Sequence, residues 1–322
     1  MSEQRVFVTG GSGFVGGHVI EALSQRYEVG AMARSDASAR KVAGFGARPV
    51  RTDLDTVTAD DLRGYDLVVH SAAYVEEWGP AEAYERINVA GTARLLRAAQ
   101  EAGVRRFVLV STNVTVFDGH GQRDVDEDAP YPEHGRFHYA RTKAAAERLV
   151  LDADREGFTT LAVRPCFVWG PRDNSVLPAL RRMVHQGGFV WLDGGRALVS
   201  TTHVHTLVAA VERALVAGRG GRAYFVADEG DVTIREFLQS LADADGLTLR
   251  GLSVPGGPVR TFARLTERLY DALGVERLPP VTSMAATVMS RDMTVRSDRA
   301  RAELGWAPAV DRRTALRELA QA

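Results

Sequence analysis

The sequence contains little cysteine and no long apolar run. Among 322 residues only Cys166 is a cysteine, and nowhere do about eighteen apolar residues stand together. One cysteine cannot form an internal disulfide or a thiolate metal site, which fits a reducing compartment, and its neighbours suggest a buried strand thiol. We expect no membrane span, and because the first residues lack a basic segment followed by an apolar one, we expect a cytoplasmic protein.

An excess of charge of one sign is also missing. The 40 Lys and Arg residues balance 41 Asp and Glu residues, and the formal net charge is -1. This balance gives no electrostatic attraction to nucleic acid or to an anionic membrane, so a small molecule is the expected partner. At this length the chain can bury a sizeable core, and one core domain with a smaller lobe fits the composition.

The first half of the sequence alternates short apolar runs with longer periodic segments. This alternation is typical of repeated strand–helix units that form a parallel sheet. The predicted strands are 5–9, 28–33, 47–52, 67–71, 107–110 and 160–164. Two long alanine-rich stretches, 81–102 and 139–155, favour the crossover helices of such a fold. The strict alternation ends near Gly170, where a second lobe is expected to begin.

A glycine-rich turn follows the first predicted strand and opens a helix. Its sequence is TGGSGFVG, with glycines at positions 10, 13 and 16. Gly10 permits the tight turn, Gly13 lets the backbone approach a pyrophosphate, and Gly16 lets the helix pack close to the sheet. An isolated match would be a flexible surface turn. Between a strand and a helix the motif indicates dinucleotide binding, with the phosphates on free helix N–H groups.

The pattern predicts an α/β protein with a Rossmann doubly wound parallel sheet and a smaller, mostly C-terminal substrate-binding lobe. We expect the NAD(P)-binding domain over residues 1–170, with 198–227 returning to it, and the second lobe over 171–197 and 228–322.

Within the second lobe, Thr233 and Glu236 have the capping-box spacing that starts a helix. Phe262, Leu265, Leu269 and Leu273 recur at helical spacing and are interpreted as a core-facing stripe.

Tyr139 and Lys143 form a Y-x-x-x-K step on a predicted helix, so both side chains point to one face. A nearby ammonium and a positive nicotinamide favour the phenolate, which lets Tyr139 exchange a proton with a carbinol or carbonyl. A lone Y-x-x-x-K usually lies on a surface helix. At this distance after a dinucleotide-binding turn it predicts a catalytic pair.

Motifs along nearly the whole chain resemble those of the extended short-chain dehydrogenases/reductases, the NAD-dependent epimerase/dehydratase superfamily. These motifs are the glycine-rich turn, Asp53-Leu54, V-H-S-A-A at 69–73, N-V-A-G-T at 88–92, R-P to G-P-R-D at 164–173, and E-L-G-W-A-P at 303–308. The resemblance is closest to the 3β-hydroxysteroid dehydrogenase-like and carbonyl-reductase branch, partly through Arg164-Pro165 and Trp78-Gly79.

The resemblance implies a site for NAD(P) and a catalytic group of Thr112, Tyr139 and Lys143. The hydroxyl of Thr112 would hydrogen-bond the substrate oxygen, with Ser111 and Asn113 as alternatives if the register shifts, and Lys143 would hold the nicotinamide ribose. The implied cofactor contacts are Gly10, Gly13, Phe14, Val15, Gly16, Arg34, Ser35, Asp53, Leu54, Ser71, Ala72, Ala73, Asn88, Ser111, Tyr139, Lys143, Pro165 and Val168. A homodimer through the two long crossover helices is also implied.

The residues after the second predicted strand bear on the choice of cofactor. A carboxylate there suits the 2'-hydroxyl of NAD(H), whereas a cation suits the 2'-phosphate of NADP(H). The sequence reads Ala33-Arg34-Ser35, so Arg34 and Ser35 favour NADP(H), with NAD(H) as the alternative. A shift of two residues would place Asp36 there instead, and Arg34 as a solvated loop charge is the competing interpretation.

Departures from the family pattern bear on the reaction. The Asp-Glu pair of sugar 4,6-dehydratases is replaced by Asn113 and Val114, which disfavours dehydration. In similar epimerases an Asn and an Arg hold the nucleotide diphosphate, and the corresponding positions here are Phe167 and Val199. Losing those polar groups would cost binding of a nucleotide sugar, so an apolar substrate in contact with Thr112, Asn113 and Phe167 is expected.

We therefore expect an NAD(P)-dependent oxidoreductase acting on an apolar ketone, aldehyde or secondary alcohol, steroid-like or similar. One alternative is a nucleotide-sugar epimerase with tightly bound NAD, in which Phe167 only packs in the core and Arg172 or Arg196 holds the nucleotide. Another is a non-catalytic NADP(H)-binding sensor or scaffold, which would have no need for the catalytic group.

Other polar residues carry weaker signals. His203 and His205 have no third ligand near in sequence, so they are interpreted as structural and no metal site is expected. A cluster before the active-site helix is interpreted as a solvated loop, made of Asp124, Asp126, Glu127 and Asp128.

Overall fold

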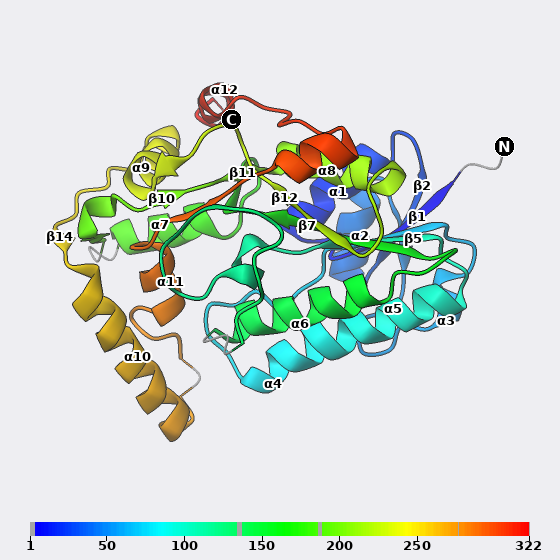
Figure 1. Ribbon diagram of the computed structural model, residues 1–322, viewed down its shortest axis with the longest axis horizontal. Coiled ribbons are helices and arrows are strands. Elements are labelled where there is room, and N and C mark those ends of the chain that lie inside the picture. The colour runs from blue at the N-terminus through cyan, green and yellow to red at the C-terminus, as the bar shows by residue number, and fades with distance from the viewer. Residues whose placement is uncertain (1–3, 134–136, 186–188, 276, 322) are drawn as a thin grey trace.

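A seven-stranded parallel sheet forms the centre of the molecule (Figure 1). The computed structural model describes residues 4–133, 137–185, 189–275 and 277–321. The strands, in spatial order, are β12 (Arg222–Val226), β7 (Thr159–Pro165), β5 (Arg106–Val110), β4 (Leu67–His70), β1 (Arg5–Thr9), β2 (Glu28–Met32) and β3 (Arg48–Val50). The order reverses between β1 and β4, as in a doubly wound sheet, so the predicted fold class is confirmed.

Helices cover both faces of this sheet. One face carries α1 (Phe14–Leu23), α2 (Asp36–Gly44) and α8 (Val204–Val216), and the other carries α3 (Ala59–Leu62), α5 (Thr92–Glu101) and α6 (His138–Asp152). The side chains of β1 alternate accordingly: Val6 and Val8 belong to the first layer's core and Phe7 to the second, and none of the three is exposed. Parallel strands buried on both faces read as the continuous apolar runs seen in the sequence.

The helical stretch expected over 81–102 is present, but it is not uniform. It begins with α4 (Ala81–Tyr84), widens into a π-helical segment over Glu85–Gly91, and continues as α5. π-helical turns often occur at functional sites. Here the widened turn carries Asn88, whose contacts with the active-site helix are described below.

A second group of elements flanks the carboxyl edge of the main sheet. A four-stranded sheet has the order β13 (Val232–Thr233), β10 (Leu198–Val199), β15 (Met293–Val295) and β6 (Gln122–Val125). Two strand pairs join β8 (Val168–Trp169) to β11 (Thr202–His203) and β9 (Trp191–Leu192) to β14 (Ser253–Val254). The helices are α7 (Val176–His185), α9 (Ile234–Ala244), α10 (Gly256–Leu273), α11 (Ser283–Val288) and α12 (Arg312–Leu319).

The core of this second group is aromatic, with Trp169, Trp191 and Phe237 almost fully buried. The predicted capping box at the start of α9 is confirmed, because the Thr233 hydroxyl accepts from Glu236 N at 3.1 Å while Glu236 accepts from Thr233 N at 3.0 Å. Strand β6 precedes the active-site helix in sequence and still joins this sheet. The exact domain boundaries stay a prediction.

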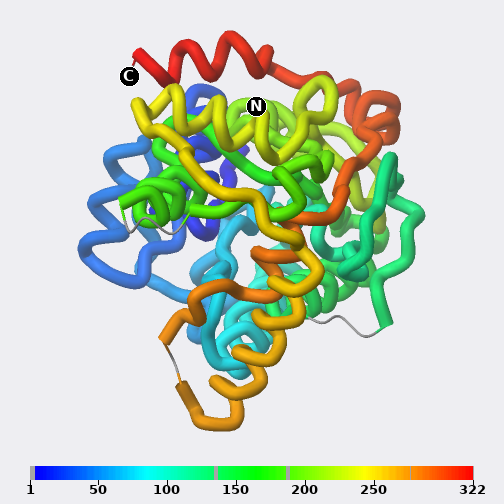
Figure 2. The backbone as a smooth tube through the Cα atoms, turned by 90° about the vertical axis from the view of Figure 1, so that its left-hand side faces the viewer, coloured from blue at the N-terminus to red at the C-terminus, as the bar shows by residue number. Residues whose placement is uncertain are grey.

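The interpretation of the α10 stripe as core-facing is wrong. Phe262, Leu265, Leu269 and Leu273 are 56%, 59%, 56% and 67% exposed. The helix packs through another face, and Figures 1 and 2 show it projecting from the body of the molecule. Periodicity reveals that a helix has an apolar face but not what that face contacts.

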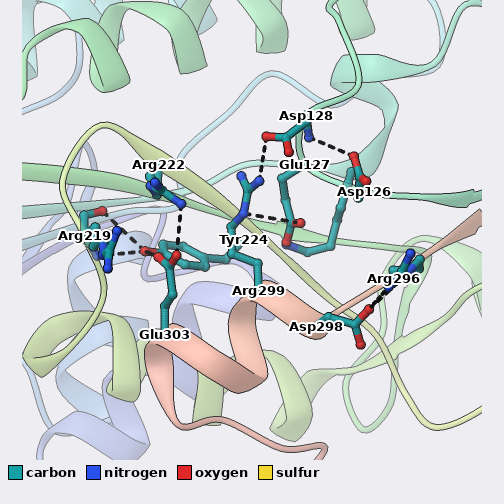
Figure 3. Close-up of polar contacts among 11 residues, drawn as sticks. Asp126, Glu127, Asp128, Arg219, Arg222, Tyr224, Arg296, Asp298, Arg299 and Glu303 are labelled. Atoms are coloured by element: carbon teal, nitrogen blue, oxygen red, sulfur yellow. Dashed lines mark hydrogen bonds and ion pairs between the residues drawn. The ribbon is translucent and has the colours of Figure 1, made fainter.

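A polar cluster ties the C-terminal segment to the main sheet (Figure 3). Glu127, expected in a solvated loop, is instead buried and accepts from Phe225 N at 2.8 Å. Arg299 lies 3.7 Å from Glu127 and donates to Asp128 at 2.6 Å. The buried Glu127 carboxylate accepts a hydrogen bond from a backbone N–H of the edge strand β12, which would otherwise be unpaired. Sequence spacing does not reveal this contact, because the two residues are far apart in the chain.

Candidate active site

The glycine-rich turn leaves no room for side chains between β1 and α1. Gly10 has φ +70°, and a Cβ there would lie 2.7 Å from Ala72 N. A Cβ on Gly16 would lie 2.2 Å from the carbonyl oxygen of Gly10. Gly13 caps α1 without any side-chain hydrogen bond, so the first N–H groups of this helix are free for an anion. Phe14 and Val15, which follow, are half-buried. This close-packed turn fits a dinucleotide pyrophosphate.

The loop after β4 is fixed to this turn by hydrogen bonds. The Ser71 hydroxyl donates to Thr9 O at 2.6 Å, and Ala72 N donates to the Thr9 hydroxyl at 3.2 Å. His70 bridges the hydroxyls of Thr9 and Thr92 at 2.7 and 2.8 Å. Burial lowers the pKa of His70 to about 3, so its ring is neutral. Residues 71–73 thereby line the loop beside the turn and stay partly exposed.

The adenosine end of the expected site carries two arginines. Arg34 is exposed directly after β2, and Ser35 caps α2, accepting from Ser38 N at 3.2 Å. Asp36 forms an ion pair with Arg51. Arg51 follows β3 at the same edge of the sheet where Arg34 follows β2, because Met32 and Val50 are register partners. The carboxylate that would suit NAD(H) is therefore already paired with a cation. Arg51 was not singled out from the sequence, since only the β2–β3 register brings it here.

Asp53 and Leu54 lie in the loop that follows β3. Asp53 Oδ1 accepts from the backbone N–H groups of Asp55 and Thr56, both at 2.9 Å, so it shapes its own loop. Leu54 is buried beneath the π-helical segment, where a Cβ on Gly91 would lie 2.9 Å from it.

The structure brings Thr112, Tyr139 and Lys143 together at the carboxyl end of β5. Lys143 on α6 is 4% exposed, and its ammonium donates to Val110 O at 2.9 Å. Tyr139, one turn earlier, lies near the hydroxyl of Thr112, which caps a short 3₁₀ turn over Asn113–Val116. A tyrosine and a threonine hydroxyl can thus both reach one substrate oxygen.

Burial shifts the pKa values of both Tyr139 and Lys143. Burial raises the pKa of Tyr139 to about 12, with an opposing effect from the Thr112 hydrogen bond. Burial also lowers the pKa of Lys143 to about 8, against the attraction of Glu147. The Lys143 ammonium is directed to the Val110 carbonyl. The stabilisation of the phenolate by Lys143 and a bound nicotinamide therefore stays a prediction.

The expected substrate contacts lie on both sides of this group. Asn113 is buried beside Thr112. Phe167 is half-buried and packs edge-to-face on Phe237 at 5.3 Å. Val199 is 2% exposed within β10, so no charged side chain could replace it without repacking.

The two arginines weighed as alternative nucleotide ligands are both outside the core. Arg172 donates to Glu21 on α1 at 2.9 Å and lies over the Phe45 ring at 4.8 Å. Arg196 is exposed. Because Arg172 is already paired with Glu21 on α1, its contacts disfavour a role in holding a nucleotide sugar.

Comparison with known proteins decides the family. The NAD dependent epimerase/dehydratase family matches residues 6–227. The chain belongs to this family. Its members' extended short-chain architecture agrees with the sheet, the glycine-rich turn and the catalytic group, and the protein is an oxidoreductase of that type.

Two relatives of this epimerase/dehydratase-family chain and one solved structure match it over nearly its full length. A 4-hydroxy-2-methyl-3-oxo-4-farnesyl-3,4-dihydroquinoline-1-oxide ketoreductase from Stigmatella aurantiaca is 38% identical, covering 99% of this chain and 96% of the relative. A 3 beta-hydroxysteroid dehydrogenase/Delta 5-->4-isomerase from Mycobacterium tuberculosis is 32% identical, covering 98% and 89%. The structure of MoeE5 with UDP-glucose and NAD has TM-score 0.76 at 25% identity, covering 98% and 97%.

Sequence reasoning missed residues that position the active-site helix of this family member. Glu147, one turn after Lys143, is fully buried and pairs with Arg164 on β7 at 2.6 Å. The Tyr131 hydroxyl also donates to Glu147 at 2.7 Å. A buried pair of this kind sets the rotation of α6 against the sheet, since leaving either charge unpaired is costly. The R-P motif was the only available signal.

Asn88, expected at the cofactor, is also held by protein groups. It is 2% exposed, accepts from Tyr74 N at 2.7 Å, and donates to Tyr74 O and to the Thr142 hydroxyl, both at 3.1 Å. It thereby joins the loop after β4 to α6.

Three expected cofactor contacts lie where the main sheet meets the second group of elements. Pro165 ends β7, Val168 begins β8, and Ser111 is 5% exposed after β5, its hydroxyl without a partner among the described residues. A buried hydroxyl of this kind fits a ligand hydrogen bond.

The remaining polar candidates have structural surroundings. Cys166 is buried, which raises the pKa of its thiol well above the usual range. His203 packs on Trp169 at 4.7 Å, and burial lowers its pKa to about 4. In the described parts of the chain no group of three or more His, Cys, Asp or Glu residues is placed to hold a metal ion.

Proposed function

We propose that the protein reduces an apolar ketone or aldehyde, or oxidises the corresponding secondary alcohol, with NADP(H). The observation that carries this proposal is the grouping of half-buried Thr112 and Tyr139 with buried Lys143, together with the close-packed turn at residues 10–16. The bound nicotinamide supplies or accepts the hydride. The protein's own residues transfer the proton, stabilise the substrate oxygen and bind the ribose.

The Tyr139 hydroxyl is the acid in this proposal. With its pKa raised to about 12, the phenol is protonated at neutral pH and can donate a proton to the oxygen of a carbonyl that is being reduced. The Thr112 hydroxyl donates a hydrogen bond to the same oxygen and stabilises its developing charge. Lys143, already fixed near Val110, binds the ribose and orients the ring. Oxidation runs through the same groups in reverse.

The preference for NADP(H) rests on Arg34 and Arg51. Two guanidinium groups at the start of α2 would both reach a 2'-phosphate, and the helix N-terminus adds a favourable dipole. NAD(H) remains the alternative, since the structural neighbour MoeE5 contains NAD.

A pair of variants tests the cofactor proposal. Arg34→Asp should weaken NADPH binding by roughly tenfold or more and leave NADH binding nearly unchanged, because only NADPH presents a dianion to that position. The exposed Arg40→Asp on α2 is the control, and titration by fluorescence gives both dissociation constants. An equal loss of affinity for both cofactors would refute the role of Arg34.

The apolar nature of the substrate rests on Phe167 and Val199, where polar diphosphate ligands would otherwise stand. The two relatives are named for a farnesylated ketone and a hydroxysteroid, both large and apolar. The second candidate, a nucleotide-sugar epimerase, is favoured by the UDP-glucose in the neighbour MoeE5.

Two measurements, NADPH oxidation and calorimetry, separate these functions. Steady NADPH oxidation with steroid-like or long-chain ketones, and no measurable heat on adding UDP or UDP-glucose to the NADPH complex, is the expected result. Tight binding of UDP-glucose without net NADPH oxidation would instead establish the epimerase. Cofactor binding without turnover of either substrate class would indicate a sensor or scaffold.

A further inference from the structure

Helix α10 carries a continuous apolar stripe on its outer surface. The helix runs over Gly256–Leu273 and ends at Gly274, which has a left-handed conformation. Its four stripe residues are all more than half exposed, namely Phe262, Leu265, Leu269 and Leu273. Figures 1 and 2 both show this helix standing out from the molecule. Exposed apolar patches of this kind mark an interaction site.

The stripe is not needed to hold α10 in place. Ala263 is fully buried, Glu267 accepts from Ser283 N at 2.6 Å, and Tyr270 packs edge-to-face on Trp78 at 6.3 Å. These residues lie on a different side of the helix from the stripe. The packing of α10 on the body is therefore complete without it.

Basic side chains border the stripe. Arg264 and Arg268 lie one turn apart and are exposed, and neither forms an ion pair with a carboxylate among the described residues. Arg268 is three residues after Leu265 and thus its neighbour on the helix surface. Just past the helix, Arg277 and Leu278 add one more basic and one more apolar side chain, both exposed. The whole chain has a net charge of -1, so this basic edge is a local feature.

We propose that α10 docks the protein on the surface of an anionic phospholipid membrane. The stripe enters the boundary between headgroups and acyl chains, and Arg264 and Arg268 bind the lipid phosphates at its edge. A helix with one strongly apolar face and adjacent arginines is suited to lie in this interface. No helix in the described ranges is long and apolar enough to cross a membrane, so the docking is peripheral.

The end of α10 is also joined to the loop that follows β4, because the Trp78 indole donates to Val275 O at 3.2 Å. The inference goes beyond the proposed function and does not depend on it.

Vesicle sedimentation with the full-length protein tests the stripe. The wild type should sediment with vesicles of phosphatidylcholine and phosphatidylglycerol at low salt, and Leu265→Asp combined with Leu269→Asp should abolish sedimentation. Val216→Asp is the matched control, because Val216 on α8 is 59% exposed, like Leu265, and lies outside α10. Unchanged thermal unfolding and NADPH binding show that each variant is folded.

The arginines are tested separately. Arg264→Gln with Arg268→Gln should weaken binding to the anionic vesicles roughly 25-fold, about fivefold for each charge. Arg313→Gln with Arg317→Gln removes an exposed pair of the same spacing from α12, away from α10 in Figure 1, and should leave binding unchanged.

Three results would overturn the proposal. The wild type could stay in the supernatant with anionic vesicles, or the control variants could lose binding as fully as the α10 variants. The wild type could also be a dimer in solution that the Leu265→Asp and Leu269→Asp changes convert to a monomer, without vesicle binding by either. The stripe would then be the contact between two copies of this chain.

Discussion

At the scale of single residues, the site is governed by burial. Tyr139 and Lys143 lie one helical turn apart, as the sequence predicts, yet their pKa values move in directions that the spacing does not indicate. Desolvation disfavours the charged form of each group, and it outweighs their mutual effect because the lysine ammonium is bound to Val110 O. A neutral phenol and a lysine near its titration point follow from this environment.

The role of Tyr139 is tested by removing one oxygen atom. Tyr139→Phe should lower kcat by roughly two or more orders of magnitude, because the proton-transfer group is lost, while cofactor affinity and the melting temperature stay close to those of the wild type. Tyr27→Phe, in the turn between α1 and β2, is the control. Turnover within a few-fold of wild type would contradict the assignment.

Lys143 makes stability depend on pH in a defined window. Its folded pKa of about 8 lies below the usual 10.5, so the unfolded chain binds more protons between these values, and stability rises with pH across that window. Relative to Lys143→Met, the wild type should therefore gain about 2 kcal/mol of unfolding free energy from pH 8 to pH 10. Urea unfolding at several pH values measures this, with Lys41→Met on the surface of α2 as the control. A pH-independent difference would refute the perturbed lysine.

At the scale of elements, α1 packs so closely on the sheet that the glycine-rich turn has no room for a side chain at Gly16. A Cβ on Gly16 would approach the Gly10 carbonyl oxygen to 2.2 Å, whereas a Cβ on Gly44, in α2, would have no neighbour within 4 Å. The same substitution should therefore have opposite effects in two neighbouring helices.

Gly16→Ala should lower the unfolding free energy by about 1–3 kcal/mol and weaken cofactor binding, because α1 must move away from the turn. Gly44→Ala should be neutral or stabilise by roughly 0.5–1 kcal/mol, since alanine favours the helix. Urea unfolding and NADPH titration compare the two. Similar effects at both positions would show that the turn tolerates a side chain.

At the scale of the whole molecule, the C-terminal segment is clamped onto the main sheet. Figure 3 shows Arg299 directed at Glu127 and Asp128, while Arg296 pairs with Asp298 in solvent. Burial raises the pKa of Glu127, which indicates that its charge depends on nearby partners such as Arg299.

Arg299→Met should lower the unfolding free energy by about 2 kcal/mol, because it leaves the Glu127 carboxylate buried without its cation. Arg296→Met removes an exposed ion pair and should cost at most about 1 kcal/mol. Chemical unfolding of both variants gives the comparison. Equal losses would mean that the clamp contributes no more than a surface pair.

The sequence alone was sufficient for the fold class, the dinucleotide turn and the Tyr139–Lys143 step. Each is a local signal: an apolar period, a glycine spacing between a strand and a helix, and a pair of residues one turn apart. The capping box at Thr233 was readable for the same reason. The family motifs added Thr112, which no local rule singles out.

Only the tertiary structure decided what those patterns face. The α10 stripe has helical periodicity, but whether it meets a core or solvent depends on where the helix packs. Arg51 reaches Asp36 at the start of α2 only through the register of β2 and β3, and Glu147 meets Arg164 only because α6 packs on β7. Burial, and with it the pKa values of Tyr139 and Lys143, depends on residues distant in sequence, so it cannot be derived from spacing along the chain.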